Sequence, residues 1–151
     1  SGFALVLTAM LVFSGLGSMA AGRFAAAPRR GLAIAVAAIA LWCAFAFHGL
    51  RPATLALVDL PAWARAAAIL VAVAPLAVAM GLPFPIGLDR FQAEHAGLLP
   101  WAWALNGAFS VIATPLANLL GHAAGLPLLL LAGLICYLLT LPALPPGNGS
   151  R

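Results

Sequence analysis

Apolar residues run along this chain in five long blocks, separated by short clusters of Arg, Pro, Gly and acidic residues. The blocks cover residues 3–21, 32–50, 61–82, 101–120 and 126–141. Because roughly 20 apolar residues in helical conformation cross the hydrocarbon core of a bilayer, each block is predicted to be a transmembrane helix. No alternation typical of β-strands accompanies the blocks. The pattern predicts an all-α, polytopic transmembrane helical bundle of about five spans, forming one domain over residues 1–151.

The breaks between the blocks follow from proline chemistry. The second span, residues 32–50, is predicted to end before the breaker Pro52, and the third at a helix break formed by Gly81, Pro83 and Pro85. Prolines lack the backbone N–H donor, and a proline disfavours the helical conformation of the residue before it. The residues that follow, 86–97, mix charged and apolar side chains, which predicts a short helix at the membrane interface.

Composition excludes a soluble fold. The chain is 65% hydrophobic and 7% charged, whereas soluble domains carry roughly a quarter of their residues as charges. The net charge of +4 comes from arginines that lie singly or in one pair near the ends of the blocks. Such arginines orient a membrane protein, so no nucleic-acid partner is expected, and the lipid bilayer is the expected environment.

The arginines are distributed unequally between the two predicted sides. One side carries Arg23, Arg29, Arg30, Arg90 and Arg151, and the other carries Arg51 and Arg65. Since cytoplasmic loops are enriched in basic residues, the N-terminus is predicted outside and the C-terminus in the cytoplasm. The last residues, 142–151, are rich in Pro and Gly and are expected to form a loose tail. Ser1 opens the chain without an initiator Met or a basic stretch, which indicates a fragment or a processed product rather than a signal peptide.

The fourth block carries a polar residue at every fourth position. These residues are Asn106, Ser110, Thr114, Asn118 and His122, here called the polar ridge. A buried amide needs hydrogen-bond partners, so the ridge is predicted to point into the bundle or into a wet cavity. The ridge has two possible roles, namely hydrogen bonding between helices and forming a path for a polar solute.

Small residues recur in the first block and predict close helix packing. They are Ser14, Gly15, Gly17, Ser18 and Gly22. Small residues four apart let two membrane helices approach closely. Residues 15–20 also match the dinucleotide fingerprint G-x-G-x-x-A, but no strand precedes them, so no nucleotide cofactor is expected.

The sequence contains no set of residues with the spacing typical of a catalytic or metal-binding site. The histidines (His48, His95 and His122) and the cysteines (Cys43 and Cys136) lack the spacing of metal or haem ligands. We therefore predict no catalytic residues, no metal and no cofactor. A site shared by His48 and His122 stays conceivable, since both fall on the predicted outer side.

Three stretches together resemble a known family. They are FSGLGS at 13–18 with AGR at 21–23, MGLPFPIGL at 80–88, and PWAWALNGAFSV at 100–111. The chain resembles the C-terminal membrane region of bacterial proteins in which a major-facilitator-like, transporter-like region is fused to a spermidine-synthase-like domain. The resemblance implies a helical bundle in the bacterial inner membrane, beside a cytoplasmic polyamine-synthase-like domain. The aminopropyltransferase-like active site would lie outside this chain.

Three functions follow as hypotheses. The first is a non-catalytic role, in which the helices anchor a soluble spermidine-synthase-like domain or serve as an accessory subunit among other membrane helices. The alternative is transport or channelling of a small polar or amine solute along the polar ridge. A cationic amine normally needs an acid within the membrane, whereas Asp59, Asp89 and Glu94 all fall at predicted interfaces. An enzyme acting on lipid is the third hypothesis, with Arg90, Glu94 and His95 as its candidates.

Overall fold

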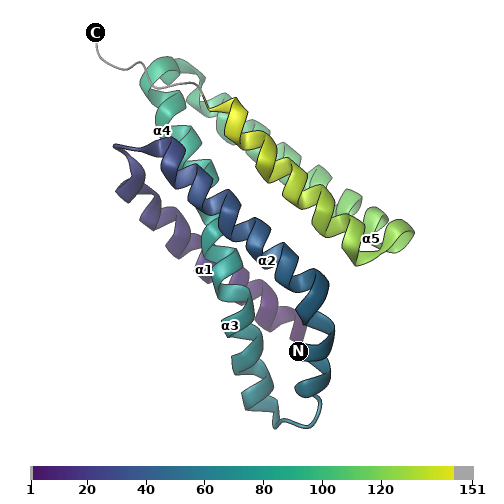
Figure 1. Cartoon of the computed structure of the whole chain (residues 1–151). Coiled ribbons are helices and arrows are strands. Elements are labelled where there is room, and N and C mark those ends of the chain that lie inside the picture. Colours follow the sequence, from purple (N-terminus) through teal and green to yellow (C-terminus); the bar gives the residue numbers. More distant parts are fainter. Residues whose placement is uncertain (1, 145–151) are drawn as a thin grey trace.

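The computed structural model describes residues 2–144, and 2–143 lie almost entirely in helices. Side chains are described for all of these residues except 2, 3, 50, 51, 54 and 93–96. The elements are α1 (Gly2–Ala20), the 3-10 helix η1 (Ala21–Phe24), α2 (Pro28–Ala56), α3 (Ala62–Gly81), α4 (Pro83–His95), the 3-10 helix η2 (Ala96–Leu98) and α5 (Leu99–Ala143) (Figure 1). The all-α prediction is confirmed, whereas most of the predicted tail, including Arg151, lies outside the described residues.

Four stretches of this described chain are helical, long and apolar enough to cross a membrane. They are Ala4–Phe24, Pro28–Gly49, Ala62–Gln92 and Leu99–Ala143. Their length and composition fit the prediction of a helical membrane protein. Five apolar blocks become four helical stretches because the last two blocks lie within the single element α5.

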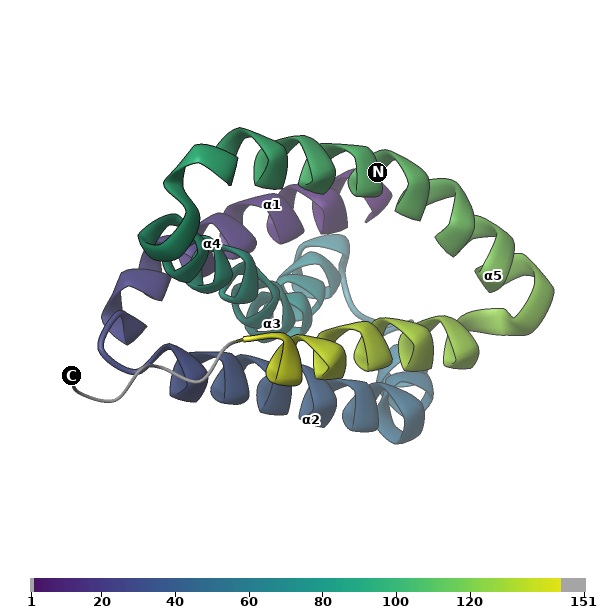
Figure 2. The same cartoon turned by 90° about the horizontal axis from the view of Figure 1, so that it is seen from above.

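No loop separates the predicted spans 101–120 and 126–141, because α5 stays helical through Ala124. Only Gly125 leaves the helical region, with φ 78° and ψ 171°. The two alanines before it favour helix, and glycine alone adopts such a φ without strain. One residue therefore replaces the loop, and α5 folds back on itself as a hairpin of two helical segments, 99–124 and 126–143 (Figures 1 and 2).

The second predicted span, residues 32–50, matches the apolar stretch Pro28–Gly49, but Pro52 does not end the helix. Helix α2 continues through Pro52 to Ala56. A proline inside a helix removes one backbone hydrogen bond and bends the helix, but the turns on either side persist. Accordingly, α2 changes direction toward its C-terminal end (Figure 1).

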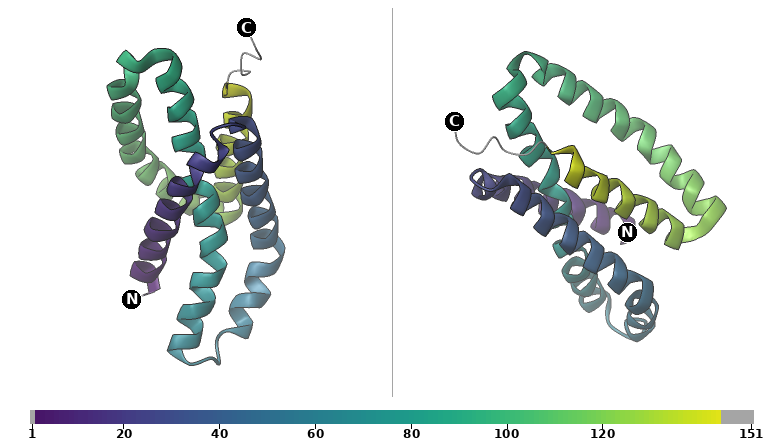
Figure 3. Two further views of the ribbon diagram at one scale, coloured as in Figure 1. Left: turned by 90° about the vertical axis from the view of Figure 1, so that its left-hand side faces the viewer. Right: turned by 45° about the horizontal axis from the view of Figure 1, so that its top comes forward.

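The predicted helix break lies where α3 gives way to α4. Helix α3 ends at Gly81 and α4 begins at Pro83. Leu82 between them keeps helical angles, φ −78° and ψ −43°, so the chain bends without reversing. Pro85 falls in the first turn of α4, where a missing N–H donor is tolerated. Figure 3 shows α4 extending onward from α3.

Small residues dominate the core. One buried cluster joins Ala21, Ala35, Leu82 and Ile86, and another joins Ile39, Cys43 and Ala79. In the second cluster, Leu134 and Tyr137 from the 126–143 segment pack against α2 and α3. The 99–124 segment runs apart from α2 (Figure 2), and none of the described residues of α5 is buried. Half of this hairpin thus belongs to the bundle, and the other half is largely unpartnered.

Candidate functional site

Helices α1 and α3 approach most closely at two glycines. A Cβ atom added to Gly17 would overlap the Val78 carbonyl oxygen, and one added to Gly81 would overlap the Ser14 carbonyl oxygen. The Ser18 hydroxyl donates a hydrogen bond of 3.0 Å to the Gly81 carbonyl oxygen across the same crossing. The backbones touch because neither glycine carries a side chain.

The other small residues of the first block lie elsewhere. Gly15 and Gly22 have nothing within 4 Å of an added Cβ atom. The Ser14 hydroxyl donates to the Leu11 carbonyl oxygen of its own helix at 3.2 Å. The role of Gly81 in this crossing was missed, since the sequence marked it only as a helix breaker. The signal was present, because Ala77 precedes Gly81 by four residues and makes a second small-residue repeat.

The polar ridge does not point into the bundle. All of its side chains are exposed rather than packed against other described helices, and they lie on the 99–124 segment of α5. The Ser110 hydroxyl donates to the Asn106 carbonyl oxygen at 2.7 Å, and the Thr114 hydroxyl to the Ser110 carbonyl oxygen at 3.1 Å. These hydroxyls are satisfied within their own helix. The amides of Asn106 and Asn118 make no side-chain hydrogen bond to any described residue.

The structure brings no metal-binding group together among the residues that it describes. It has no cluster of three or more His, Cys, Asp or Glu side chains there. Cys43 is buried, Cys136 is exposed, and both are free thiols. His48 and His122 are exposed. The side chains of Glu94 and His95, candidates for a lipid enzyme, lie outside the described residues.

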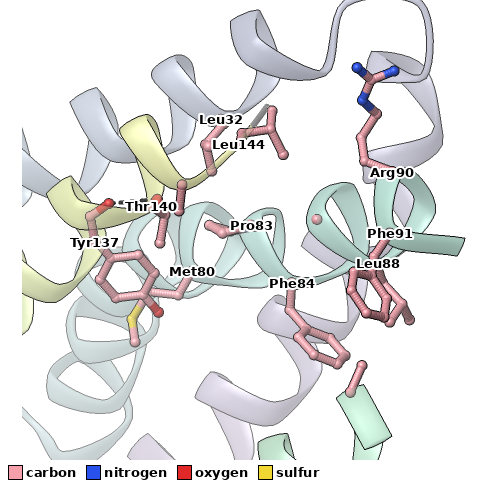
Figure 4. A pocket seen from close by; sticks show the side chains of 13 residues that line it. Leu32, Met80, Pro83, Phe84, Leu88, Arg90, Phe91, Tyr137, Thr140 and Leu144 are labelled. Carbon is pink, nitrogen blue, oxygen red and sulfur yellow. Dashed lines mark hydrogen bonds between the residues drawn. The ribbon is translucent and has the colours of Figure 1, made fainter. Parts of the chain in front are cut away.

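A cavity of about 670 Å³ opens beside α4. Its walls come from the start of α2, the bend between α3 and α4, α4 itself, and both ends of α5 (Figure 4). The lining is mainly apolar, and its polar side chains are Arg90, Tyr137 and Thr140. The Thr140 hydroxyl donates to the Tyr137 carbonyl oxygen at 2.6 Å. None of the residues that line this cavity belongs to the polar ridge.

Two contacts hold the walls of this cavity in place. The Arg29 guanidinium donates a hydrogen bond of 3.0 Å to the carbonyl oxygen of Leu144, which ties the start of α2 to the end of α5. The rings of Phe84 and Trp103 meet edge to face at 5.1 Å between their centroids, which joins α4 to the start of α5. This cavity could not be predicted from the sequence, because its lining residues are far apart along the chain.

Comparison of the chain with known protein families, with curated proteins and with solved structures gives no match.

Proposed function

We propose that this chain is a non-catalytic membrane domain that anchors or assembles a larger membrane complex. The observation that carries the proposal is the largely unpartnered 99–124 segment of α5, whose exposed ridge holds two unpaired amides. An amide that faces hydrocarbon without a hydrogen-bond partner is destabilising. Another polypeptide that covers this segment would supply the missing donors and acceptors.

The resemblance to spermidine-synthase-like membrane proteins suggests what that partner is. Under the proposal, the covering surface belongs to other membrane helices of such a protein, and a soluble aminopropyltransferase-like domain lies beside them. Large apolar side chains on the same segment agree with a buried environment in the assembly, since Trp101, Phe109 and Val111 are more than half exposed here. Such exposed apolar surface marks lipid or protein contact.

The proposal includes about five crossings of the bacterial inner membrane. Helix α5 has 45 residues, which at 1.5 Å per residue give about 68 Å, more than twice the roughly 30 Å of a hydrocarbon core. Folding back at Gly125 divides α5 into two segments, each suited to one crossing. With the excess of arginines in the cytoplasm, the N-terminus lies outside and the C-terminus inside.

Replacing Asn106 and Asn118 together by Leu tests this function. The double variant is expected to release the partner, because hydrogen bonds between membrane helices contribute roughly 0.6–2 kcal/mol each. The measurement is the mass of the native assembly in mild detergent. Thr8→Val, which removes an exposed hydroxyl from α1, is the matched control and should keep the wild-type mass.

The transport alternative makes a different prediction for the same variant. If the ridge lined a solute path, the double variant would abolish uptake into vesicles while the mass of the assembly stayed unchanged. That outcome would contradict the assembly role. The described cavity, which has no ridge residue in its lining, favours assembly over transport.

A further inference from the structure

The cavity beside α4 combines an apolar lining with a permanent positive charge. Its apolar walls include Leu32, Met80, Phe84 and Leu88, and its volume is about 670 Å³. Apolar cavities of this size with few polar groups are typical binding sites for small amphipathic molecules. Arg90 is the charged residue in the lining.

Arg90 carries an unsatisfied donor. Its Nε atom is inaccessible to solvent and has no hydrogen-bond partner among the described residues. A buried N–H group without an acceptor is destabilising, so native proteins rarely keep one. An anionic oxygen in the cavity would neutralise the guanidinium, and it would accept from Nε once the side chain turns toward it. Arginine matches phosphate well because its planar fork donates two parallel hydrogen bonds.

The surrounding charge also favours an anion. Arg29 lies at the edge of the cavity, where its guanidinium bonds the carbonyl oxygen of the lining residue Leu144. Helix α2 begins at the same end of the molecule as α4 (Figure 1), so Arg30 adds a second exposed cation there. Asp89 is exposed, and no ion pair joins it to Arg90 in the described part of the chain. Positive charge therefore exceeds negative charge around the described cavity wall.

We propose that this cavity binds an anionic phospholipid, with its phosphate on Arg90 and one acyl chain between α4 and the end of α5. A phospholipid supplies an anionic phosphate, which suits Arg90, and a long apolar acyl chain, which suits the apolar walls of the cavity. Basic pockets between membrane helices on the cytoplasmic side hold such headgroups. The arginines at this end lie on the predicted cytoplasmic side. This inference goes beyond the assembly role and does not depend on it.

Native mass spectrometry of the full chain in mild detergent tests whether the cavity prefers an anionic lipid headgroup. With added phosphatidylglycerol or phosphatidylethanolamine, bound phosphatidylglycerol should dominate. Arg90→Ala should weaken its binding by about tenfold or more, as expected for loss of a charged hydrogen bond. Arg65→Ala removes the same charge from an exposed position outside the lining, at the start of α3 far from the cavity, and should change binding by less than about twofold. Equal binding of the two lipids, or equal effects of the two variants, would overturn the proposal.

A pair of glycine variants tests whether an acyl chain occupies the cavity. This test stays informative if Arg90→Ala fails to fold. Gly87 lines the cavity, and a Cβ atom added to it meets nothing within 4 Å. Gly87→Phe should fill the cavity and abolish bound phosphatidylglycerol. Gly107 is equally open but lies outside the lining, so Gly107→Phe should bind as wild type does. Full competition by inorganic phosphate alone, or lipid binding unaffected by Gly87→Phe, would contradict a lipid site.

Discussion

Gly17 and Gly81 let the backbones of α1 and α3 come into contact. At both, the neighbouring helix presents a backbone carbonyl where a Cβ atom would lie. Backbone cannot move aside as the end of a flexible side chain can, so any larger residue must separate α1 from α3. The Ser18 hydroxyl, bonded to the Gly81 carbonyl oxygen at 3.0 Å, depends on that same approach.

We expect Gly17→Ala to lower the free energy of unfolding by about 1–3 kcal/mol, as overpacking of a tight contact does. Gly15→Ala is the matched control, two residues away on the same helix with open space around it. It should leave stability unchanged or raise it by up to about 1 kcal/mol, because alanine favours helix. Unfolding by SDS from mild detergent measures both. Equal effects would show that α1 and α3 do not meet at Gly17.

The sequence predicts part of this contact and misses the rest. Small-residue spacing pointed to Gly17 and Ser18, but equally to Gly15 and Gly22, which meet nothing within 4 Å. The spacing of small residues shows where another helix can approach closely, but it does not show which helix packs there. The partner residue Gly81 is identified only when α3 is placed beside α1.

At the scale of the element, Gly125 decides the course of α5. Its φ of 78° with ψ of 171° lies in a region that is essentially restricted to glycine. The apolar blocks before and after it were evident from the sequence, but the single-residue turn between them was not. Two alanines extend the helix to the turn, and Pro127 opens the returning segment. Helix-favouring alanines and one glycine thus take the place of the longer loop that usually joins two helices.

Gly125→Ala should therefore destabilise the α5 hairpin by about 1–3 kcal/mol, the strain of a non-glycine residue in this conformation. Gly133→Ala, in the helical part of the returning segment with open space around it, should have no such effect. The measurement is thermal unfolding in detergent, followed by circular dichroism. If the two variants melted alike, the hairpin would not depend on glycine at 125.

For the whole molecule, the sequence predicts the fold class and the positions of the helices better than it predicts how the helices pack together. Apolar blocks of membrane length determine the all-α architecture through hydrophobicity alone. Which helices touch is harder to predict, because lipid tails are as apolar as Leu and give no directional signal. The exposed polar ridge is an example: its spacing was clear, but its predicted place inside the bundle was not found.

The proposed five crossings predict opposite accessibility at two positions. In a background with Cys43→Ala and Cys136→Ala, a cysteine replacing His122 near the α5 turn should react with an impermeant maleimide added outside cells. A cysteine replacing Arg30 should react only after permeabilisation. Both native residues are exposed, so neither position is shielded by the fold. Labelling of both cysteines from the same side would contradict the proposed topology.

The mass of the native assembly tests the central claim most directly. The chain alone has a mass of 15.3 kDa, and its 99–124 segment is largely unpartnered. Extracted from native membranes in mild detergent, it is expected to run as a larger particle that contains further polypeptide, with the 99–124 segment protected from labelling. A particle holding a single 15.3 kDa chain and only detergent and lipid, with that segment open to labelling, would contradict the assembly role.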